Sequence, residues 1–218
     1  MRLQKIIERL QKLHPKEIDL NLDRVKNLCN KLGNPQKGLR AIQICGTNGK
    51  FSTIRVLFAI LKQAEIKCNI YTSPHIQKIN ERFIYSDQEI SDNNLAKLLN
   101  EVEEVNAGDP ITFFEILTAA FFYGCKKHHQ NPTILEFGLF AKYDAVNILE
   151  ENLASIITSI GVDHTDFLPE NDRTIDRIIF EKTSSLLKSK IIVSKQCDSE
   201  TLQKIKKSLK SNNSKKII

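Results

Sequence analysis

Apolar residues recur every three or four positions near the start of the chain, which is the period of an amphipathic helix. One such set runs over residues 3–13 and predicts a first helix. A second set follows Asp23 and ends before Gly33, Asn34 and Pro35, which are typical helix terminators. Two short helices are therefore expected before residue 40.

From Ala41 onward, short apolar runs alternate with helical stretches. The runs that read as strands are AIQIC, KCNIYT, PTILEF, ASIITSI and KIIVS. Helices are expected between them at residues 52–64, 92–105, 111–127, 172–187 and 200–209. Apolar strands separated by helices are typical of a parallel sheet that is covered on both faces. The predicted fold class is α/β, with a doubly wound, mostly parallel sheet.

One segment departs from this alternation. After the second predicted strand, ERFIY and QEI flank a Ser-Asp turn. Two short apolar runs around such a turn predict a small hairpin insertion rather than a helical crossover.

Composition narrows the class of protein. The chain has 218 residues, of which 41% are hydrophobic and 27% charged, as in a folded soluble protein with one fairly large domain. The most apolar stretch, from Ile111 to Cys125, contains Glu115 and is too short to cross a bilayer. We therefore expect no membrane partner and a cytoplasmic location.

The positive charge is unevenly distributed. The net charge is +6, but residues 195–218 hold seven lysines and two acids, so almost the whole surplus lies in this end. A nucleic-acid binder would need such charge spread over a folded face, and no nucleic-acid partner is expected. The five cysteines are widely spaced without a CxxC pair, which predicts reduced thiols that fill space in the core.

One segment has the composition of a phosphate-binding loop. Between the first strand of the sheet and the next helix stand Gly46, Thr47, Asn48, Gly49, Lys50, Phe51, Ser52 and Thr53. Glycines let backbone amides turn toward an anion, the lysine can reach terminal phosphates, and a hydroxyl can hold Mg²⁺. The spacing departs from the strict GxxxxGK[ST] form. The alternative is a glycine-containing turn with an incidental lysine.

Six segments, taken in order, resemble the folylpolyglutamate synthase/dihydrofolate synthase family of the Mur ligase superfamily. They are GTNGKFST, YTSPHIQKINERF, ITFFEILTAA, LEFGLFAKYDAVN, TSIGVDHTDFLP and FEKTSSL. UDP-muramyl ligases share the loop, but TSPH with NERF and FFE resembles the folate branch. The resemblance implies a Mur-ligase-like ATPase domain and an enzyme that uses ATP and Mg²⁺. It further implies that L-glutamate is joined to a folate or dihydropteroate through an acyl phosphate, with release of ADP.

The resemblance also implies a metal site. Ser73, Glu136 and His164 match the positions where the family holds Mg²⁺, and Lys182 matches its carbamylated lysine. Oxygen donors suit this hard cation, and a carbamate would turn the lysine into an anionic ligand. Lys50, His164 and Lys182 are the expected catalytic residues.

Each assignment has a structural alternative. Ser73 could shape a turn before Pro74, and Glu136 could be a surface acid. His164, with Asp163, could be a loop residue that satisfies backbone groups, and Lys182 could lie on a solvated helix face.

The substrate residues are also implied by the resemblance. They are Asp19, Leu20, Asn21, Thr112, Phe113, Phe114, Glu115, Lys142, Tyr143 and Asp144. An aromatic pair can flank a flat heterocycle, and a carboxylate can accept hydrogen bonds from its ring N–H groups. The alternative for Phe113 and Phe114 is ordinary core packing.

Several positions depart from the family pattern. Phe51 replaces a glycine in the phosphate loop, Phe140 and Ala141 replace a glycine pair, Lys142 replaces an arginine, and Asn21 replaces a glycine. Phenylalanine adds bulk where a triphosphate must approach the backbone. The alternative function is therefore a pseudoenzyme that binds nucleotide or folate weakly without ligation.

The expected domain organisation follows from the resemblance. Residues 1–40 form a helical segment packed on the ATPase domain, residues 41–209 form an incomplete ATPase domain, and residues 210–218 form a basic frayed tail. The family's second, C-terminal ligase domain is expected to be absent, and a monomer is compatible with this organisation.

Overall fold

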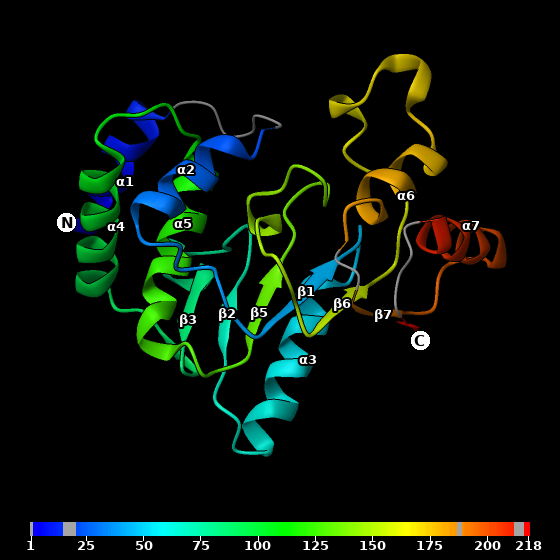
Figure 1. Ribbon diagram of the computed structural model, residues 1–218, viewed down its shortest axis with the longest axis horizontal. Helices are drawn as coiled ribbons and strands as arrows, with labels where there is room; N and C mark the ends of the chain where they lie inside the picture. Colours follow the sequence, from blue (N-terminus) through cyan, green and yellow to red (C-terminus); the bar gives the residue numbers. More distant parts are fainter. Residues whose placement is uncertain (1, 15–20, 187–188, 212–215) are drawn as a thin grey trace.

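A single eight-stranded sheet organises the molecule (Figure 1). The computed structural model describes residues 2–14, 21–186, 189–211 and 216–218. The strands are β1 (Ala41–Cys45), β2 (Asn69–Tyr71), β3 (Phe83–Tyr85), β4 (Gln88–Glu89), β5 (Thr133–Glu136), β6 (Ala154–Ile157), β7 (Lys190–Val193) and β8 (Lys216–Ile217). Their order is β4-β3-β2-β5-β1-β6-β7-β8, and only the β2–β3 and β3–β4 pairs are antiparallel. The predicted parallel α/β sheet and its hairpin are confirmed.

Seven α-helices flank this sheet in the part of the chain that the structure describes. They are α1 (Arg2–Leu13), α2 (Asp23–Lys31), α3 (Lys50–Gln63), α4 (Asp92–Asn106), α5 (Phe113–Cys125), α6 (Ile175–Thr183) and α7 (Ser199–Ser211). Helix α3 packs on β1 and β5 from one face. On the opposite side, α1 packs on α4 and α2 packs on α5, as Figure 1 shows.

Alternate residues of the strands pack into two separate hydrophobic cores. Ile44 of β1, Ile70 of β2 and Ile134 of β5 pack with Ile54 of α3 in one small cluster. The larger cluster lies on the other face and includes Cys45, the buried residues of α5, and the inner faces of α6 and α7. Since successive side chains of a strand point to opposite faces, both faces of β1 are buried. This explains its continuous apolar sequence.

Two segments near the C-terminal end differ from the prediction. Helix α6 is shorter than the expected 172–187, because the Thr174 hydroxyl accepts a hydrogen bond from the Arg177 amide (3.2 Å) and caps the helix there. The predicted frayed tail over residues 210–218 differs from the structure where Lys210 and Ser211 belong to α7 and where Lys216 and Ile217 form β8 beside β7. Residues 212–215 of that tail lie outside the described residues.

The cysteines and the helix lengths bear on two other expectations. Four of the five thiols are buried, Cys197 is exposed, and all are free. Among the described residues, no helix is long and apolar enough to cross a bilayer.

Candidate functional site

The predicted phosphate loop joins the carboxyl end of β1 to the first turn of α3. Its first glycine, Gly46, has a φ of 147°, and a Cβ atom there would lie 1.9 Å from the hydroxyl oxygen of Thr158. Gly49 has a φ of 85° in the left-handed region and caps α3. Both glycines are therefore required by the backbone path, one by close packing and one by conformation.

The loop is fixed to the segment that follows β6. The amides of Thr47 and Asn48 both donate to the carbonyl of Ser159, at 2.8 and 3.1 Å. The Thr47 hydroxyl donates to the Gly161 carbonyl (3.0 Å) and accepts from the Gly161 amide (3.1 Å). The first amides of a helix have no intrahelical partner, so the start of α3 presents donors and positive potential to an anion.

Lys50, the first residue of α3, folds back over this loop. Its ammonium donates to the carbonyls of Gly46 (3.0 Å) and Thr47 (3.3 Å). These bonds hold the positive charge over the glycine turn, where a bound phosphate would contact it.

Phe51 stands beside Lys50 in the first turn of α3. Its side chain is 49% exposed and lines a cavity of about 450 Å³, which we call the loop cavity. The walls of this cavity include the loop residues 47–51, together with Ser73 and Glu136. Ser52 is exposed and Thr53 half-buried in the same turn.

Ser73 and Glu136 meet at the inner end of the loop cavity. The Ser73 amide donates to Glu136 Oε2 (3.0 Å), while the buried Ser73 hydroxyl oxygen has no hydrogen-bond partner. Glu136 is the last residue of β5 and is only 4% exposed, so the alternative of a surface acid is wrong. Burial raises the pKa of this carboxyl, and the Ser73 amide partly opposes that shift.

Lys182 is among the most deeply buried charged groups of the described chain. It is 1% exposed, and its Nζ donates to the carbonyls of Gly46 (3.3 Å) and Leu139 (3.0 Å). The alternative of a solvated helix face is therefore wrong. Burial lowers the pKa of this amine, which favours its neutral, nucleophilic form. The side chain links the phosphate loop to the segment after β5.

His164 lies in the turn after β6, with a left-handed backbone (φ 56°). Its Nε2 is 3.3 Å from Asp163 Oδ2, and burial lowers the pKa of the imidazole while Asp163 opposes the shift. The ring is perpendicular to that of Phe140, whose centroid is 6.4 Å away. Phe140 is buried, and its ring also lies 5.7 Å from the Lys182 ammonium.

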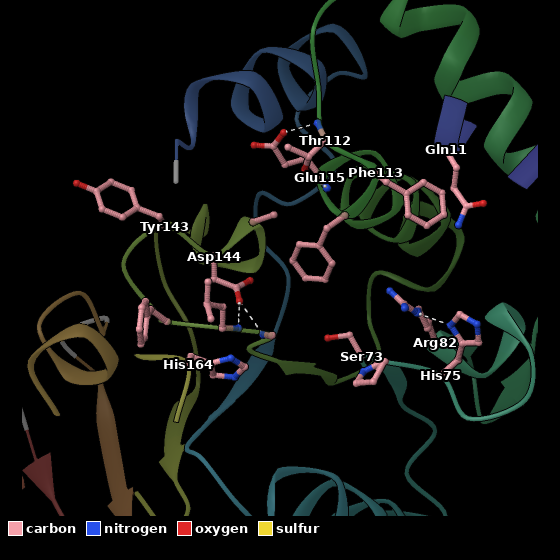
Figure 2. A pocket seen from close by; sticks show the side chains of 16 residues that line it. Gln11, Ser73, His75, Arg82, Thr112, Phe113, Glu115, Tyr143, Asp144 and His164 are labelled. Carbon is pink, nitrogen blue, oxygen red and sulfur yellow. Dashed lines mark hydrogen bonds between the residues drawn. The ribbon is translucent and has the colours of Figure 1, made fainter. Parts of the chain in front are cut away.

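A second cavity, of about 380 Å³, adjoins these groups, and we call it the aromatic cavity (Figure 2). It is lined by Phe113, Phe114, Phe140 and Tyr143, with Ser73, His75, Arg82, Asp144 and His164 among its polar residues. Ser73 lines both cavities. Pro74 also lines both, so the phosphate loop and an aromatic, ligand-sized cavity meet at this Ser-Pro pair.

The predicted substrate residues of α5 form the start of that helix. The Thr112 hydroxyl accepts from the Glu115 amide (3.2 Å), and Glu115 Oε2 accepts from the Thr112 amide (2.7 Å), as in a capping box. Glu115 also pairs with Arg24 through two 3.0 Å bonds. Its carboxylate is therefore already satisfied by the protein. Phe113 and Phe114 are half-buried and face the cavity, which differs from pure core packing.

Asp144 lies in the loop after β5 and stabilises its backbone. Its carboxylate accepts from the amides of Gly138 (2.6 Å), Leu139 (3.2 Å) and Val146 (3.1 Å). Burial raises its pKa to about 6, and the three amides oppose that shift. The neighbouring Tyr143 is exposed at the cavity rim, and its ring centroid is 4.8 Å from the Lys142 ammonium.

One predicted group is only partly described. Asp19 and Leu20 lie outside the described residues. The Asn21 side-chain oxygen accepts from the Asp23 amide (2.6 Å), at the start of α2.

Two basic residues of the aromatic cavity are among those that were not assigned a role from the sequence. His75 belongs to the TSPH segment and Arg82 to the NERF segment, and both line the aromatic cavity. The two residues are seven positions apart in an irregular segment, where spacing in the sequence does not predict which side chains lie together. Their presence in one quoted family segment, YTSPHIQKINERF, is the one sequence feature that points to them.

Few side chains that could bind a metal ion lie close together in the described part of the chain. The described residues contain no group of three or more His, Cys, Asp and Glu side chains that could hold a metal ion. The predicted set includes a serine, and the structure joins only Ser73 and Glu136 by a direct bond.

Known proteins resemble this chain in sequence. The dihydrofolate synthase/folylpolyglutamate synthase of Haemophilus influenzae is 38% identical over 173 residues, which are 79% of this chain and 38% of that protein. The Bacillus subtilis protein of the same name is 36% identical over 193 residues, or 85% and 44%. No protein-family model matches the sequence.

The fold agrees with these relatives. The structure of E. coli FolC in complex with DHPP and ADP is 30% identical, with a TM-score of 0.86 over 99% of this chain and 50% of that chain. The chain belongs to the dihydrofolate synthase/folylpolyglutamate synthase family. It spans less than half the length of the two curated relatives described above. The resemblance inferred from the six segments is confirmed at the level of the family.

Proposed function

We propose that this chain carries the nucleotide and folate sites of an ATP-dependent amide ligase of the folylpolyglutamate synthase/dihydrofolate synthase type. The observation that carries the proposal is the position of Ser73, which lines both the loop cavity and the aromatic cavity. A phosphate donor and an organic acid can thus meet at one point. Residues 41–209 form the nucleotide-binding unit in this proposal, and the helices of residues 1–40 support it through α4 and α5.

The nucleotide is ATP, as the ADP bound in the E. coli relative suggests. Residues 46–53 hold its phosphates through the free amides at the start of α3 and through the ammonium of Lys50. Ser159 and Gly161 keep the loop in shape from the side. The loop is held by the protein itself, so little ordering is needed on binding.

The donors beside the loop fit Mg²⁺. The orphan hydroxyl of Ser73 and the buried carboxylate of Glu136 are adjacent oxygen ligands, and His164 lies beside the same junction. Mg²⁺ commonly uses one or two carboxylates together with substrate phosphates and water, so a larger cluster of acidic residues is not required. When bound, the ion would neutralise charge on the transferred phosphoryl group.

Lys182 stabilises the same site through hydrogen bonds to the backbone. Its lowered pKa makes the amine available for carbamylation, which the family pattern implies. In the structure the amine donates to two carbonyls and so fixes the phosphate loop against the segment after β5.

The aromatic cavity takes the pterin-bearing acid. Phe113 and Phe114 flank the flat heterocycle, while Thr112 and Glu115 hold the helix start that presents them. Asp144 shapes the opposite wall, and Lys142 and Tyr143 stand at its rim. Asn21 borders the start of α2, and roles for Asp19 and Leu20 stay predictions.

The reaction divides into two transfers. A carboxylate oxygen of the acid attacks the γ-phosphorus of ATP, and the bond to the β,γ-bridging oxygen breaks to release ADP. The amine of L-glutamate then attacks the acyl carbon, phosphate leaves with the C–O bond electrons, and a proton is lost to give the amide. Lys50 stabilises the phosphoryl charge, and the protein contributes mostly positioning.

The test is a coupled product measurement. Purified protein is incubated with MgATP, L-glutamate and either dihydropteroate or tetrahydrofolate, and ADP and glutamylated product are quantified together. Equal amounts of both products are expected, with no ADP release when the acid is omitted. ADP released without glutamylated product would contradict the ligase proposal.

The second candidate is a protein that binds nucleotide or folate weakly without ligation. Phe51 favours it, because an exposed benzyl group lines the loop cavity where the family has glycine. Saturable binding of MgATP and of a folate without any product would support this candidate over the first.

A further inference from the structure

Arg82 is a cation of the aromatic cavity that forms no close ion pair with a carboxylate of the described residues, although its charge acts to lower the pKa of Glu136. It ends the 3-10 helix η1 (Ile79–Arg82), directly before β3. The cavity's carboxylates are engaged elsewhere, since Glu115 pairs with Arg24 and Asp144 accepts from three backbone amides. A half-buried guanidinium beside aromatic walls is more stable with an anion nearby.

The guanidinium is held in one orientation. Its Nε donates to His75 Nδ1 (3.0 Å), so this imidazole nitrogen is unprotonated and the ring proton resides on Nε2. The segment between the two residues is also fixed, because Glu81 accepts hydrogen bonds from the amides of Ile76, Gln77 and Lys78. With Nε bonded to His75 and a further side-chain hydrogen bond from the guanidinium to Tyr71, the other N–H groups of the terminal nitrogens remain for a ligand.

The position of Arg82 indicates which end of a ligand it would meet. It lines the aromatic cavity together with Ser73, a residue that also lines the loop cavity, and Figure 2 shows Ser73, His75 and Arg82 on one side of that space. Phe113 and Tyr143 lie on other parts of the wall. An acid whose rings occupy the aromatic part would therefore present its carboxylate toward Arg82 and the phosphate loop.

We propose that Arg82 binds the carboxylate of the pterin-bearing acid and that His75 is a positioning residue that orients the guanidinium. This proposal rests on the proposed function of the aromatic cavity. A planar fork of N–H donors matches a carboxylate and holds one of its oxygens in line for phosphoryl transfer. The Arg82 guanidinium disfavours a neutral amide at this position relative to a carboxylate, because an amide carries no charge to offset that of the guanidinium.

The experiment compares two ligands that differ only at this end. Pteroate and pteroic acid amide share the heterocycle and the benzoyl ring, and their dissociation constants are measured by calorimetry without nucleotide. Wild-type protein should bind pteroate at least tenfold more tightly than the amide, about 1.4 kcal/mol. Arg82→Gln should lose this preference and bind the amide as wild type does. Arg40→Gln, which changes an exposed arginine before β1, is the matched control and should keep it.

Two variants of His75 test the positioning role. His75→Ala removes the acceptor for Arg82 Nε and should reduce the preference for pteroate severalfold. His75→Asn offers a side-chain oxygen near the position of Nδ1 and should restore most of it. Equal loss in both variants would contradict an orienting role for His75.

The outcomes separate the two proposals. If wild-type protein binds both ligands and Arg82→Gln keeps the preference for pteroate, the assignment of Arg82 is wrong while the aromatic cavity stays a folate site. If wild-type protein binds neither ligand, the folate site itself is wrong, and the role of Arg82 is overturned with it. A loss of MgATP affinity in Arg82→Gln with unchanged pteroate binding would assign the residue to the nucleotide instead.

Discussion

Phe51 carries a benzyl group at the mouth of a phosphate loop. Its backbone amide belongs to the first turn of α3 and stays available to an anion, because the first amides of a helix lack intrahelical partners. The side chain does not enter the core, since it is 49% exposed and lines the loop cavity. The ring therefore competes for space with a ligand, while the donors beneath it are intact.

This geometry makes a specific prediction for nucleotide binding. Phe51→Gly and Phe51→Ala should each tighten ATP binding about tenfold, or about 1.4 kcal/mol, because both remove the ring from the cavity. Calorimetry at fixed Mg²⁺ and salt measures the change. Val56→Ala, five residues further along α3 at an exposed position that does not line the loop cavity, is the control and should leave the affinity unchanged. Equal affinities for wild type and both Phe51 variants would show that the ring does not obstruct the site.

Two opposing effects, burial and hydrogen bonding, set the pKa of the Asp144 carboxyl. Three backbone amides bind its carboxylate, yet burial dominates and raises the pKa to about 6 from an ordinary value of 3.8. The folded protein therefore binds a proton at Asp144 more tightly than the unfolded chain does. Between these two pKa values the folded state holds more protons, so this residue's contribution to stability falls as the pH rises.

We expect this contribution to appear in the pH dependence of unfolding. The free energy of unfolding, measured by urea denaturation from pH 4 to pH 7, should decline less steeply for Asp144→Asn than for wild type. The asparagine variant will be less stable overall, because its amide nitrogen cannot accept the bonds that a carboxylate oxygen accepts. The difference in slope is therefore the measurement, and parallel curves would contradict the raised pKa.

Residue-level chemistry was only partly predictable from the sequence. The loop glycines, Lys50 and the buried Glu136 were recognisable because each stands in a quoted family segment at a strand end. The engagement of Glu115 by Arg24 was not predictable, since the two residues are far apart in sequence. The same holds for the pairing of His75 with Arg82, which depends on the path of an irregular loop.

At the scale of elements, the periodicity of apolar residues correctly predicted where most strands and helices lie. Local capping residues determined where a helix such as α6 begins. The strands β1, β5 and β7 fall inside the predicted runs, because their apolar residues face a core or a covered sheet face. Helix α6 was predicted too long because its apolar period continues beyond the Thr174 cap and the turn at Ser184. Strand β8 was missed because two residues are too few for a detectable pattern.

The phosphate loop shows how elements combine into a site. Its shape depends on β6 as much as on its own glycines, since Thr158 fills the space against Gly46 and Ser159 accepts from two loop amides. Neither contact follows from the loop sequence. Parallel pairing of β1 with β6 brings these segments together at the carboxyl ends of both strands, where α/β sheets collect ligands.

At the scale of the whole molecule, the site joins both cores. Helix α3 belongs to the smaller cluster and α5 to the larger one, and the sheet separates them. Lys50 starts α3, while Phe113 starts α5 and lines the aromatic cavity. Ligands at the junction therefore contact elements from both faces of the sheet, and binding should stabilise the entire fold against unfolding.

The last prediction measures this linkage. MgATP at about one hundred times its dissociation constant should stabilise the protein by about 2.7 kcal/mol, which at about 2–4 °C per kcal/mol for a chain of this size raises the Tm by about 5–11 °C. The shift should be larger with Mg²⁺ than with EDTA, because Ser73 and Glu136 are the oxygen ligands that we propose beside the loop. Glu136→Ala and His164→Ala, each compared with its own ligand-free Tm, should lose the part that depends on Mg²⁺ and keep the remainder. Full retention of the Mg²⁺-dependent shift in both variants would contradict the metal assignment, whereas no shift in wild type would contradict nucleotide binding at the loop.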